Sequence, residues 1–310
     1  MLLGNSYGRE ITRNLNVPNS VNNIWLIQGM SGSGKSTFCK NIIKSAAEDE
    51  ISVIVIDCSN SCLHKDVPYI SDKDYHIIER EGLGIDIFKP KSINIEGYDK
   101  KETLGDTADR ICNSLCSALN IKGVTQTDIL GECIRNEIDG GKPTLSGVLN
   151  RIKQSNFTAA RTLALKLRSI KDVKFNGNPV DWNEIISSKR ATVFQFSYTP
   201  EPKRTFLIEL LLNDLWDFVK QSENDKGFLL ILDEIQNMRF KGECFLSHLR
   251  VYFKPDNANI TAAAKSIDAS DYAEWMKILR SLNIGECIYS GMIDGYDGLQ
   301  NIVLKVNGNG

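Results

Sequence analysis

Short runs of apolar residues alternate with longer stretches that have helical spacing. The clearest run, Ile24 to Gln28, is followed by a helical pattern over Phe38 to Glu50 and by a second apolar run, Ile51 to Ile56. Ala191 to Phe196 has the pattern of a further strand, and the five consecutive apolar residues Phe228 to Leu232 predict a strand that is buried on both faces. This alternation predicts an α/β fold with a mostly parallel sheet flanked by helices, because parallel strands are joined by crossover helices.

Between these runs, residues 100–174 show helical spacing almost throughout. We therefore predict an all-helical insertion there, within a core made of residues 1–99 and 175–310. Turn signals such as residues 139–143 separate the expected helices, which cover Thr103 to Leu119, Thr127 to Ile138, Thr144 to Lys153 and Phe157 to Ile170.

The remaining segments predict elements that complete the core. Tyr75 to Phe88 has the pattern of a hairpin-like pair of strands interrupted by Gly82 and Gly84. Further expected elements are a long helix over Pro202 to Gln221, a helix over Asp271 to Leu282, and closing strands over Glu286 to Ser290 and Asn301 to Val306.

The composition is that of a folded chain with little net charge. Hydrophobic residues make up 42% of 310 residues, and 37 lysines and arginines face 39 acidic residues, for a net charge of -2. No chain-wide positive field can therefore attract nucleic acid, so a DNA-binding surface would have to be local. No segment approaches the roughly 18 apolar residues of a membrane helix, and no secretory signal pattern opens the chain, so we expect a cytoplasmic protein without a membrane partner.

Eight cysteines are scattered through the predicted elements, which is typical of free thiols in a reducing compartment. The grouping most like a metal site is Cys58, Cys62 and His64, and Cys112 with Cys116 forms a second pair. Neither grouping has the paired spacing of a zinc site. We favour free thiols over zinc ligands for both.

A segment that contains the motif GxxxxGK[ST] lies between the first strand and the first helix. This context predicts a phosphate-binding loop, because the loop delivers phosphates to a helix N-terminus that favours negative charge. A chance glycine-rich turn is the alternative, and the flanking strand and helix disfavour it. The predicted nucleotide-binding residues are Gly29, Met30, Ser31, Gly32, Ser33, Gly34, Lys35, Ser36 and Thr37.

Within this loop the side chains have distinct expected roles. The glycines allow consecutive amides to turn toward the β-phosphate. We expect Lys35 to bridge the β- and γ-phosphates of ATP as a catalytic residue, Ser36 to complete a Mg²⁺ shell, and Thr37 to contact the α-phosphate.

Two carboxylates follow the buried strand that begins at Phe228. Ligands bind beyond the carboxyl ends of strands in open α/β sheets, so we predict that Asp233 holds Mg²⁺ and that Glu234 activates the attacking water. A simple helix cap is the alternative. Asp57 also ends a strand, and for it we favour a structural role over a role in the active site.

The end of the predicted insertion is the most basic part of the chain. From 151 to 174 there are seven cations and one acid, giving a local charge of 7 - 1 = +6. On the last helix an apolar stripe of Phe157, Ala160, Leu163, Ala164, Leu167 and Ile170 would turn the cations outward. This predicts a contact with DNA or a neighbouring subunit, with a plain solvated helix face as the alternative. The cations are Arg151, Lys153, Arg161, Lys166, Arg168, Lys171 and Lys174.

These motifs resemble the HerA/FtsK group of DNA-pumping P-loop ATPases, which includes conjugative coupling and secretion ATPases. The resemblance is greatest to the HerA-like ATPase domains of DNA-phosphorothioation restriction proteins of the DptH type. It spans nearly the whole chain, and the two nucleotide motifs are its specific part. The segments that carry it are the glycine motif, FLLILDEIQNM (228–238), the preceding FQFSYTPEPKRTFLIELLLNDLWDFV (194–219), Asp181-Trp182 near the start of a sheet strand, Tyr252 to Pro255, and Leu279 to Cys287.

The resemblance implies a RecA-like core that forms a hexameric ring, with ATP at subunit interfaces and duplex DNA in the channel. It also implies partners such as a nuclease or other defence or transfer subunits. An arginine from the neighbouring subunit would reach the γ-phosphate. The candidates are Arg168, Arg190, Arg204, Arg239 and Arg250.

The sequence departs from the family after Glu234, where about twenty residues replace a longer segment with a γ-phosphate-sensing strand. Three hypotheses therefore stand. The first is a ring-forming DNA translocase in genome defence or mobile-element transfer. The second is an ATP-binding switch or assembly subunit with little turnover, and the third is a small-molecule phosphotransferase, against which Glu234 argues.

Overall fold

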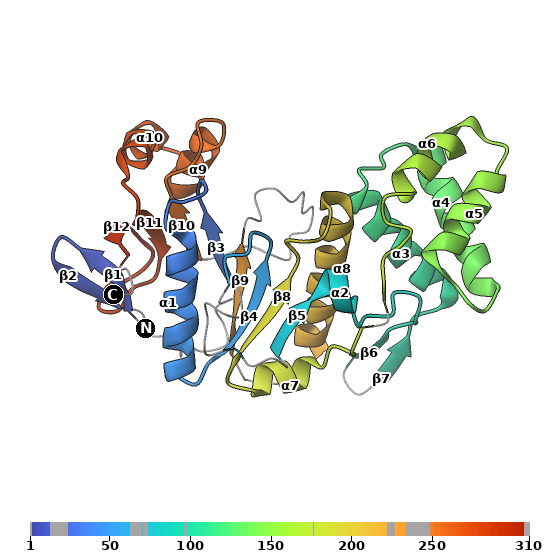
Figure 1. The fold of residues 1–310 in the computed structure, drawn as a ribbon, viewed down its shortest axis with the longest axis horizontal. Coiled ribbons are helices and arrows are strands. Elements are labelled where there is room, and N and C mark those ends of the chain that lie inside the picture. The colour runs from blue at the N-terminus through green and yellow to red at the C-terminus, as the bar shows by residue number, and fades with distance from the viewer. Residues whose placement is uncertain are drawn as a thin grey trace.

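The computed structural model describes residues 2–12, 24–62, 70, 74–95, 98–175, 177–221, 227–233 and 249–306, and Figure 1 shows their arrangement. The described strands form a ten-stranded mixed sheet in the order β2-β1-β12-β11-β10-β3-β9-β4-β8-β5. From β10 to β5 all neighbours are parallel. These strands are β10 (Leu249–Phe253), β3 (Ile24–Gln28), β9 (Phe228–Asp233), β4 (Ser52–Asp57), β8 (Ala191–Gln195) and β5 (Tyr75–Ile77).

The other end of the sheet is antiparallel. It consists of β11 (Glu286–Gly291), β12 (Gln300–Lys305), β1 (Leu2–Ser6) and β2 (Arg9–Thr12). Two helices, α9 (Ile260–Ile267) and α10 (Tyr272–Ser281), accompany this end (Figure 1). A separate two-stranded sheet joins β6 (Ser92–Ile95) and β7 (Tyr98–Lys101).

The central strands are buried on both faces, and their side chains alternate between two clusters. Val53 and Val55 of β4 pack with the apolar side of α1 (Lys35–Glu48), whereas Ile54 and Ile56 join the cluster that contains α8 (Glu201–Gln221). This alternation follows from the two-residue period of a strand. It explains why uninterrupted apolar runs mark β4 and β9 in the sequence.

The four helices predicted between residues 100 and 174 are confirmed, with ends that differ by a few residues. They are α3 (Leu104–Ala118), α4 (Val124–Asp139), α5 (Leu145–Gln154) and α6 (Thr158–Leu167). In Figure 1 they gather beyond α8, at the end of the molecule away from α9 and α10. Their buried side chains continue the cluster of α8, and the division of the chain into core and insertion remains a prediction.

The hairpin expected over Tyr75 to Phe88 is wrong. After the short strand β5 the chain enters one turn of helix, α2 (Ile78–Glu81), and then crosses residues 177–179. A Cβ atom at Gly84 would lie 1.7 Å from the carbonyl oxygen of Asn178, so the two segments touch where a second strand would need room. Gly84 therefore allows two backbone segments to approach closely, and it does not form a turn between strands.

One smaller expectation also needs correction. Phe157 precedes the first turn of α6 in an extended conformation and is 62% exposed, so it falls outside the buried stripe of that helix. Asp181 and Trp182, expected near the start of a sheet strand, are the N-cap and the first residue of the helix α7 (Trp182–Ser187), which precedes β8. Strands β1, β2 and β10 and helix α9 are elements that the sequence pattern did not predict. None of the described helices is both long and apolar enough to cross a membrane.

Candidate functional site

The loop between β3 and α1 has the backbone of a phosphate-binding loop. Gly29, Gly32 and Gly34 have φ values of 152°, 77° and 112°, which side chains rarely allow. At Gly29 a Cβ atom would also lie 2.5 Å from the Cβ of Phe253, so glycine is required twice over. The sequence motif therefore folds into a narrow loop whose amides can face an anion.

Lys35 is folded back over this loop. Its Nζ donates to the carbonyl oxygens of Gly29 at 2.8 Å and Met30 at 3.1 Å, and the side chain is 6% exposed. The ammonium group thus lies at the mouth of the loop. Ser36 is exposed, and Thr37 is half-buried, at the start of the helix.

The first turn of α1 is suited to negative charge. Gly34 is the N-cap and supplies no side-chain cap, and no acidic residue lies in the first turn. The N-terminus and the dipole of this 14-residue helix therefore favour an anion beside Lys35.

Segments from the far end of the chain brace the loop. The Met30 N–H donates to Lys254 O at 2.9 Å, and the Gly285 N–H donates to Ser33 O at 2.9 Å. Phe253 lies in β10, the parallel neighbour of β3, and its ring packs against Phe38 of α1. Sequence reasoning missed these contacts, because nothing in the local pattern links residues 253–285 to the loop.

Asp233 ends the strand that lies directly beside the loop strand. Strands β3 and β9 are parallel neighbours, and Ile27 is the register partner of Asp233. The side chain of Asp233 is 1% exposed. The structure thus brings this carboxylate to the same sheet edge as the glycine loop.

Two serines that the sequence pattern did not single out hold Asp233. Ser61 Oγ donates to Asp233 Oδ2 at 2.7 Å, and Ser59 Oγ makes a short hydrogen bond to the same oxygen. Both serines belong to the turn after β4. The available signal was a Ser-Asn-Ser sequence shortly after an acid-tipped buried strand.

Asp57 organises that turn. Its buried carboxylate accepts backbone N–H groups of Ser59 (2.9 Å), Ser61 (3.1 Å) and Cys62 (2.8 Å), and Gln195 Nε2 at 2.9 Å. The structural role favoured for Asp57 matches these contacts. Asp57 therefore positions the serines that in turn contact Asp233.

The thiols near this network are buried and do not suggest a metal site. A hydrogen bond with Cys62, burial, and the negative charges of Asp233 and Asp57 raise the pKa of the Cys39 thiol well above its usual value. His64 lies outside the described residues. Among the residues that are described, no group of three or more His, Cys, Asp or Glu side chains is placed to hold a metal ion.

The remaining predicted site residues are Glu234 and the candidate arginines. Glu234 and Arg239 lie outside the described residues. Arg190 is ion-paired with Asp74 at 3.2 Å, and Arg250 donates to Ser266 O at 2.8 Å, so both side chains are engaged within the chain. Arg168 is exposed.

Some cations of the basic segment have partners within the chain, although they lie at its surface. Arg151 pairs with Glu137 at 2.6 Å, and Lys166 donates to Asn120 O at 2.8 Å. Arg161 and Arg168 are exposed. Lys153 and Lys174 are exposed as well, and none of the seven cations is buried.

A comparison with known protein families shows which family this chain belongs to. The sequence profile described as "Helicase HerA, central domain" matches residues 2–215. The chain belongs to the HerA central-domain family. Among proteins of curated function, none matches the chain.

Solved structures share the fold of this HerA-type domain. VirB4 of Thermoanaerobacter pseudethanolicus is similar with a TM-score of 0.66 and 13% identity over 100% of this chain and 96% of that one. The bacterial conjugative coupling protein TrwB, in its unbound form, gives 0.55 and 11% identity over 99% and 89%. TrwB in complex with a non-hydrolysable ATP analogue gives 0.55 and 9% identity over 92% and 86%. The core is therefore the RecA-like fold of HerA/FtsK-type P-loop ATPases.

Proposed function

We propose that this chain is an ATP-hydrolysing subunit of a HerA/FtsK-type DNA translocase that acts in bacterial genome defence or mobile-element DNA transfer. The observation that carries the proposal is the pairing of Ile27 with Asp233, which brings a buried carboxylate beside the glycine loop in a HerA-family domain. An apposed phosphate loop and carboxylate are the minimum that metal-dependent triphosphate chemistry requires.

ATP would bind with its phosphates in the loop of residues 29–37. Lys35 is already at the loop mouth, where it would exchange its two carbonyl partners for phosphate oxygens. Asp233 and Ser36 supply a carboxylate and a hydroxyl, which are the oxygen donors that Mg²⁺ prefers. Bound Mg²⁺ would neutralise charge on the phosphates.

Hydrolysis needs a base for the attacking water, and Glu234, the residue after Asp233, is our candidate. In a hexameric ring, an arginine of the neighbouring subunit would stabilise charge on the γ-phosphate. Arg168 and Arg204 are the stronger candidates, because Arg190 and Arg250 already have partners within their own chain.

Duplex DNA would contact the ring through a local basic surface. Arg161 and Arg168 on and after α6 are exposed and lie outside the nucleotide site. A ring concentrates such residues from every subunit in one channel, so a chain with a net charge of -2 can still bind DNA.

Measuring ATPase activity with and without duplex DNA tests the function. We expect DNA to raise turnover several-fold, and Glu234→Gln to abolish turnover while ATP binding persists. Glu132→Gln, at an exposed acid on α4, is the matched control. A wild-type chain that binds ATP without turnover, with or without DNA, would instead support the ATP-binding switch.

Native mass measurement with a non-hydrolysable ATP analogue tests the ring separately. We expect a species six times the 34.7 kDa subunit mass. A strict monomer at all concentrations of protein and nucleotide would contradict shared sites.

A further inference from the structure

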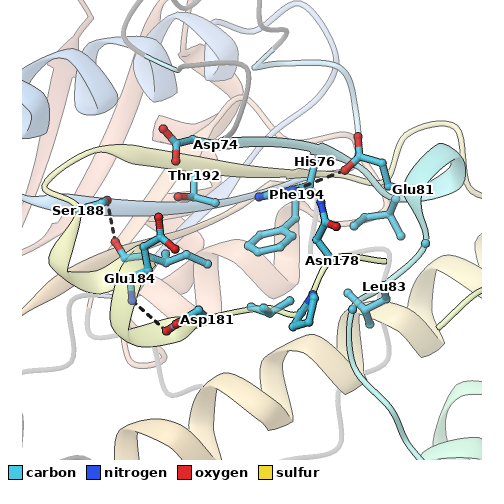
Figure 2. Close-up of a pocket in the computed structure, with 16 residues that line it drawn as sticks. Asp74, His76, Glu81, Leu83, Asn178, Asp181, Glu184, Ser188, Thr192 and Phe194 are labelled. Carbon is cyan, nitrogen blue, oxygen red and sulfur yellow. Dashed lines mark hydrogen bonds and ion pairs between the residues drawn. The ribbon is translucent and has the colours of Figure 1, made fainter. Parts of the chain in front are cut away.

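A cavity lies away from the glycine loop, on the face of the sheet at its β5 edge. It has a volume of about 250 Å³. Strands β5 and β8 supply one wall, and α7 with residues 178–180 supplies the opposite one, as Figure 2 shows. The proposed ATPase function makes no use of this cavity.

The walls are built by close backbone packing. A Cβ atom at Gly177 would lie 2.6 Å from Gly82 O, and one at Gly84 would overlap Asn178 O. The Leu83 N–H donates to Lys174 O at 2.9 Å. Two segments far apart in sequence are thereby fastened together along one side of the cavity.

The lining is acidic. Four carboxylates line the cavity, and His76 is the one basic side chain among its lining residues. Three of the carboxylates have partners within the chain: Asp74 pairs with Arg190 at 3.2 Å, Glu81 with Arg80 at 2.6 Å, and Asp181 accepts the Glu184 N–H at 3.0 Å. None of the ion pairs between described residues includes the carboxylate of Glu184.

Thr192 provides an independent sign of a ligand. It lines the cavity from β8 and is 1% exposed, yet its Oγ1 has no hydrogen-bond partner among the described residues. A buried hydroxyl without a partner costs free energy, about 1–3 kcal/mol in mutational data. In Figure 2 the Glu184 side chain rises from α7 on the side of the cavity where Thr192 lies.

Two stacked rings lie on the wall that β5 and β8 supply. His76 and Phe194 are register partners across β5 and β8, and their ring centroids are 5.2 Å apart with an interplanar angle of 23°. The Phe194 face beside the carboxylates favours an organic cation, whereas His76 lies 3.5 Å from the Glu81 carboxylate. A metal ion is a poorer fit, because the described residues contain no cluster of three ligands.

We propose that this cavity binds a small organic cation that carries an ammonium or guanidinium group. The Glu184 carboxylate accepts its N–H donors, and the Thr192 hydroxyl accepts one more. A volume of about 250 Å³ suits a molecule smaller than a drug-sized ligand.

Isothermal titration with putrescine and agmatine tests the proposal. We expect at least one of them to bind saturably, whereas neutral 1,4-butanediol and anionic succinate do not. Glu184→Gln should weaken binding roughly tenfold, as expected when one charge-assisted hydrogen bond is removed. Glu132→Gln, at an exposed acid on α4, should leave affinity unchanged.

The Thr192→Val variant distinguishes a loss of binding from a folding defect, because a folding defect would lower the melting temperature. It should raise the melting temperature of the ligand-free protein, because it removes an unpartnered buried hydroxyl, and should reduce the stabilisation that the cation provides. Lys35→Met should leave cation binding intact, so failure of the ATPase proposal is separable from failure of this one.

The proposal is overturned if putrescine and agmatine both bind no better than butanediol, or if their binding is the same in Glu184→Gln and Thr192→Val as in the wild type. It is also overturned if no free cation binds while Glu184→Gln changes the sedimentation of the protein. That last result would indicate that a lysine or arginine side chain of a second copy of this chain occupies the cavity.

Discussion

Ile27 and Asp233 are paired across neighbouring parallel strands, although most of the chain separates them in sequence. Ile27 lies two residues before Gly29, where the phosphate loop begins, and Asp233 ends the adjacent strand. Because both strands run in the same direction, their carboxyl ends share one sheet edge. The loop and the carboxylate are thus placed together by strand order rather than by local sequence.

The position of Lys35 predicts a selective loss of nucleotide binding. Lys35→Met should weaken ATP binding at least tenfold, because each charge-assisted bond to phosphate contributes about 1.5–3 kcal/mol. Lys44→Met, at an exposed position on the same helix, should bind ATP normally. Titration with a fluorescent nucleotide measures the affinity of both variants. Equal affinities would show that Lys35 does not bind the nucleotide.

The serine turn predicts a loss of both stability and activity. Ser59→Ala with Ser61→Ala takes both hydroxyl donors from a buried carboxylate, so the free energy of unfolding should fall by about 1–3 kcal/mol for each. Turnover should fall with it, because Asp233 would no longer be held in a fixed orientation. Urea unfolding and ATPase assays report the two effects.

Ser281→Ala is the matched control for the serine turn, since its exposed hydroxyl donates to Ile278 O within its own helix, at 2.8 Å. A double variant as stable and as active as Ser281→Ala would show that the serines do not position Asp233.

Glu209 predicts a pH dependence of stability. Burial raises the pKa of this carboxyl above its usual 4.5, and the hydrogen bond from Ser117 at 2.8 Å opposes the rise. The folded state then retains a proton that the unfolded state has released, so stability falls as pH rises through the raised pKa. Glu209→Gln should match the wild type near pH 4 and exceed it near pH 8 in urea unfolding. An equal pH dependence in both proteins would contradict a buried carboxyl that resists ionisation.

The exposed cations predict salt-dependent binding to DNA. Replacing Arg161 and Arg168 with glutamine should weaken duplex binding and lower the slope of log K against log salt by about 0.9 for each phosphate that the protein no longer neutralises. Arg135→Gln, at a cation paired with Asp109 at 2.6 Å, is the control. An unchanged affinity and an unchanged slope in an electrophoretic or anisotropy titration would show that this surface does not bind DNA.

The sequence predicted those parts of the fold that local patterns encode. The glycine motif with its flanking strand and helix, the buried strand ending at Asp233, and the helices between residues 100 and 174 all have a distinct period or spacing, and the structure contains them. Turn residues at the ends of these patterns placed most boundaries within a few residues.

Long-range packing was beyond the reach of those patterns. Phe253 lies against Gly29 because the order of the strands in the sheet makes them neighbours. Residues 82–84 pass residues 177–179 at a distance that only glycine permits. A Gly-interrupted apolar segment fits a hairpin equally well until its distant neighbour is known. The hydroxyls of Ser59 and Ser61 were missed for the same reason, since their partner Asp233 lies on another strand.

A crystal structure with Mn²⁺ and a non-hydrolysable ATP analogue tests the central claim most directly. We predict triphosphate oxygens at Lys35 Nζ and a Mn²⁺ anomalous peak between the Ser36 hydroxyl and the Asp233 carboxylate. Nucleotide bound elsewhere, or a metal peak remote from Asp233, would contradict this arrangement.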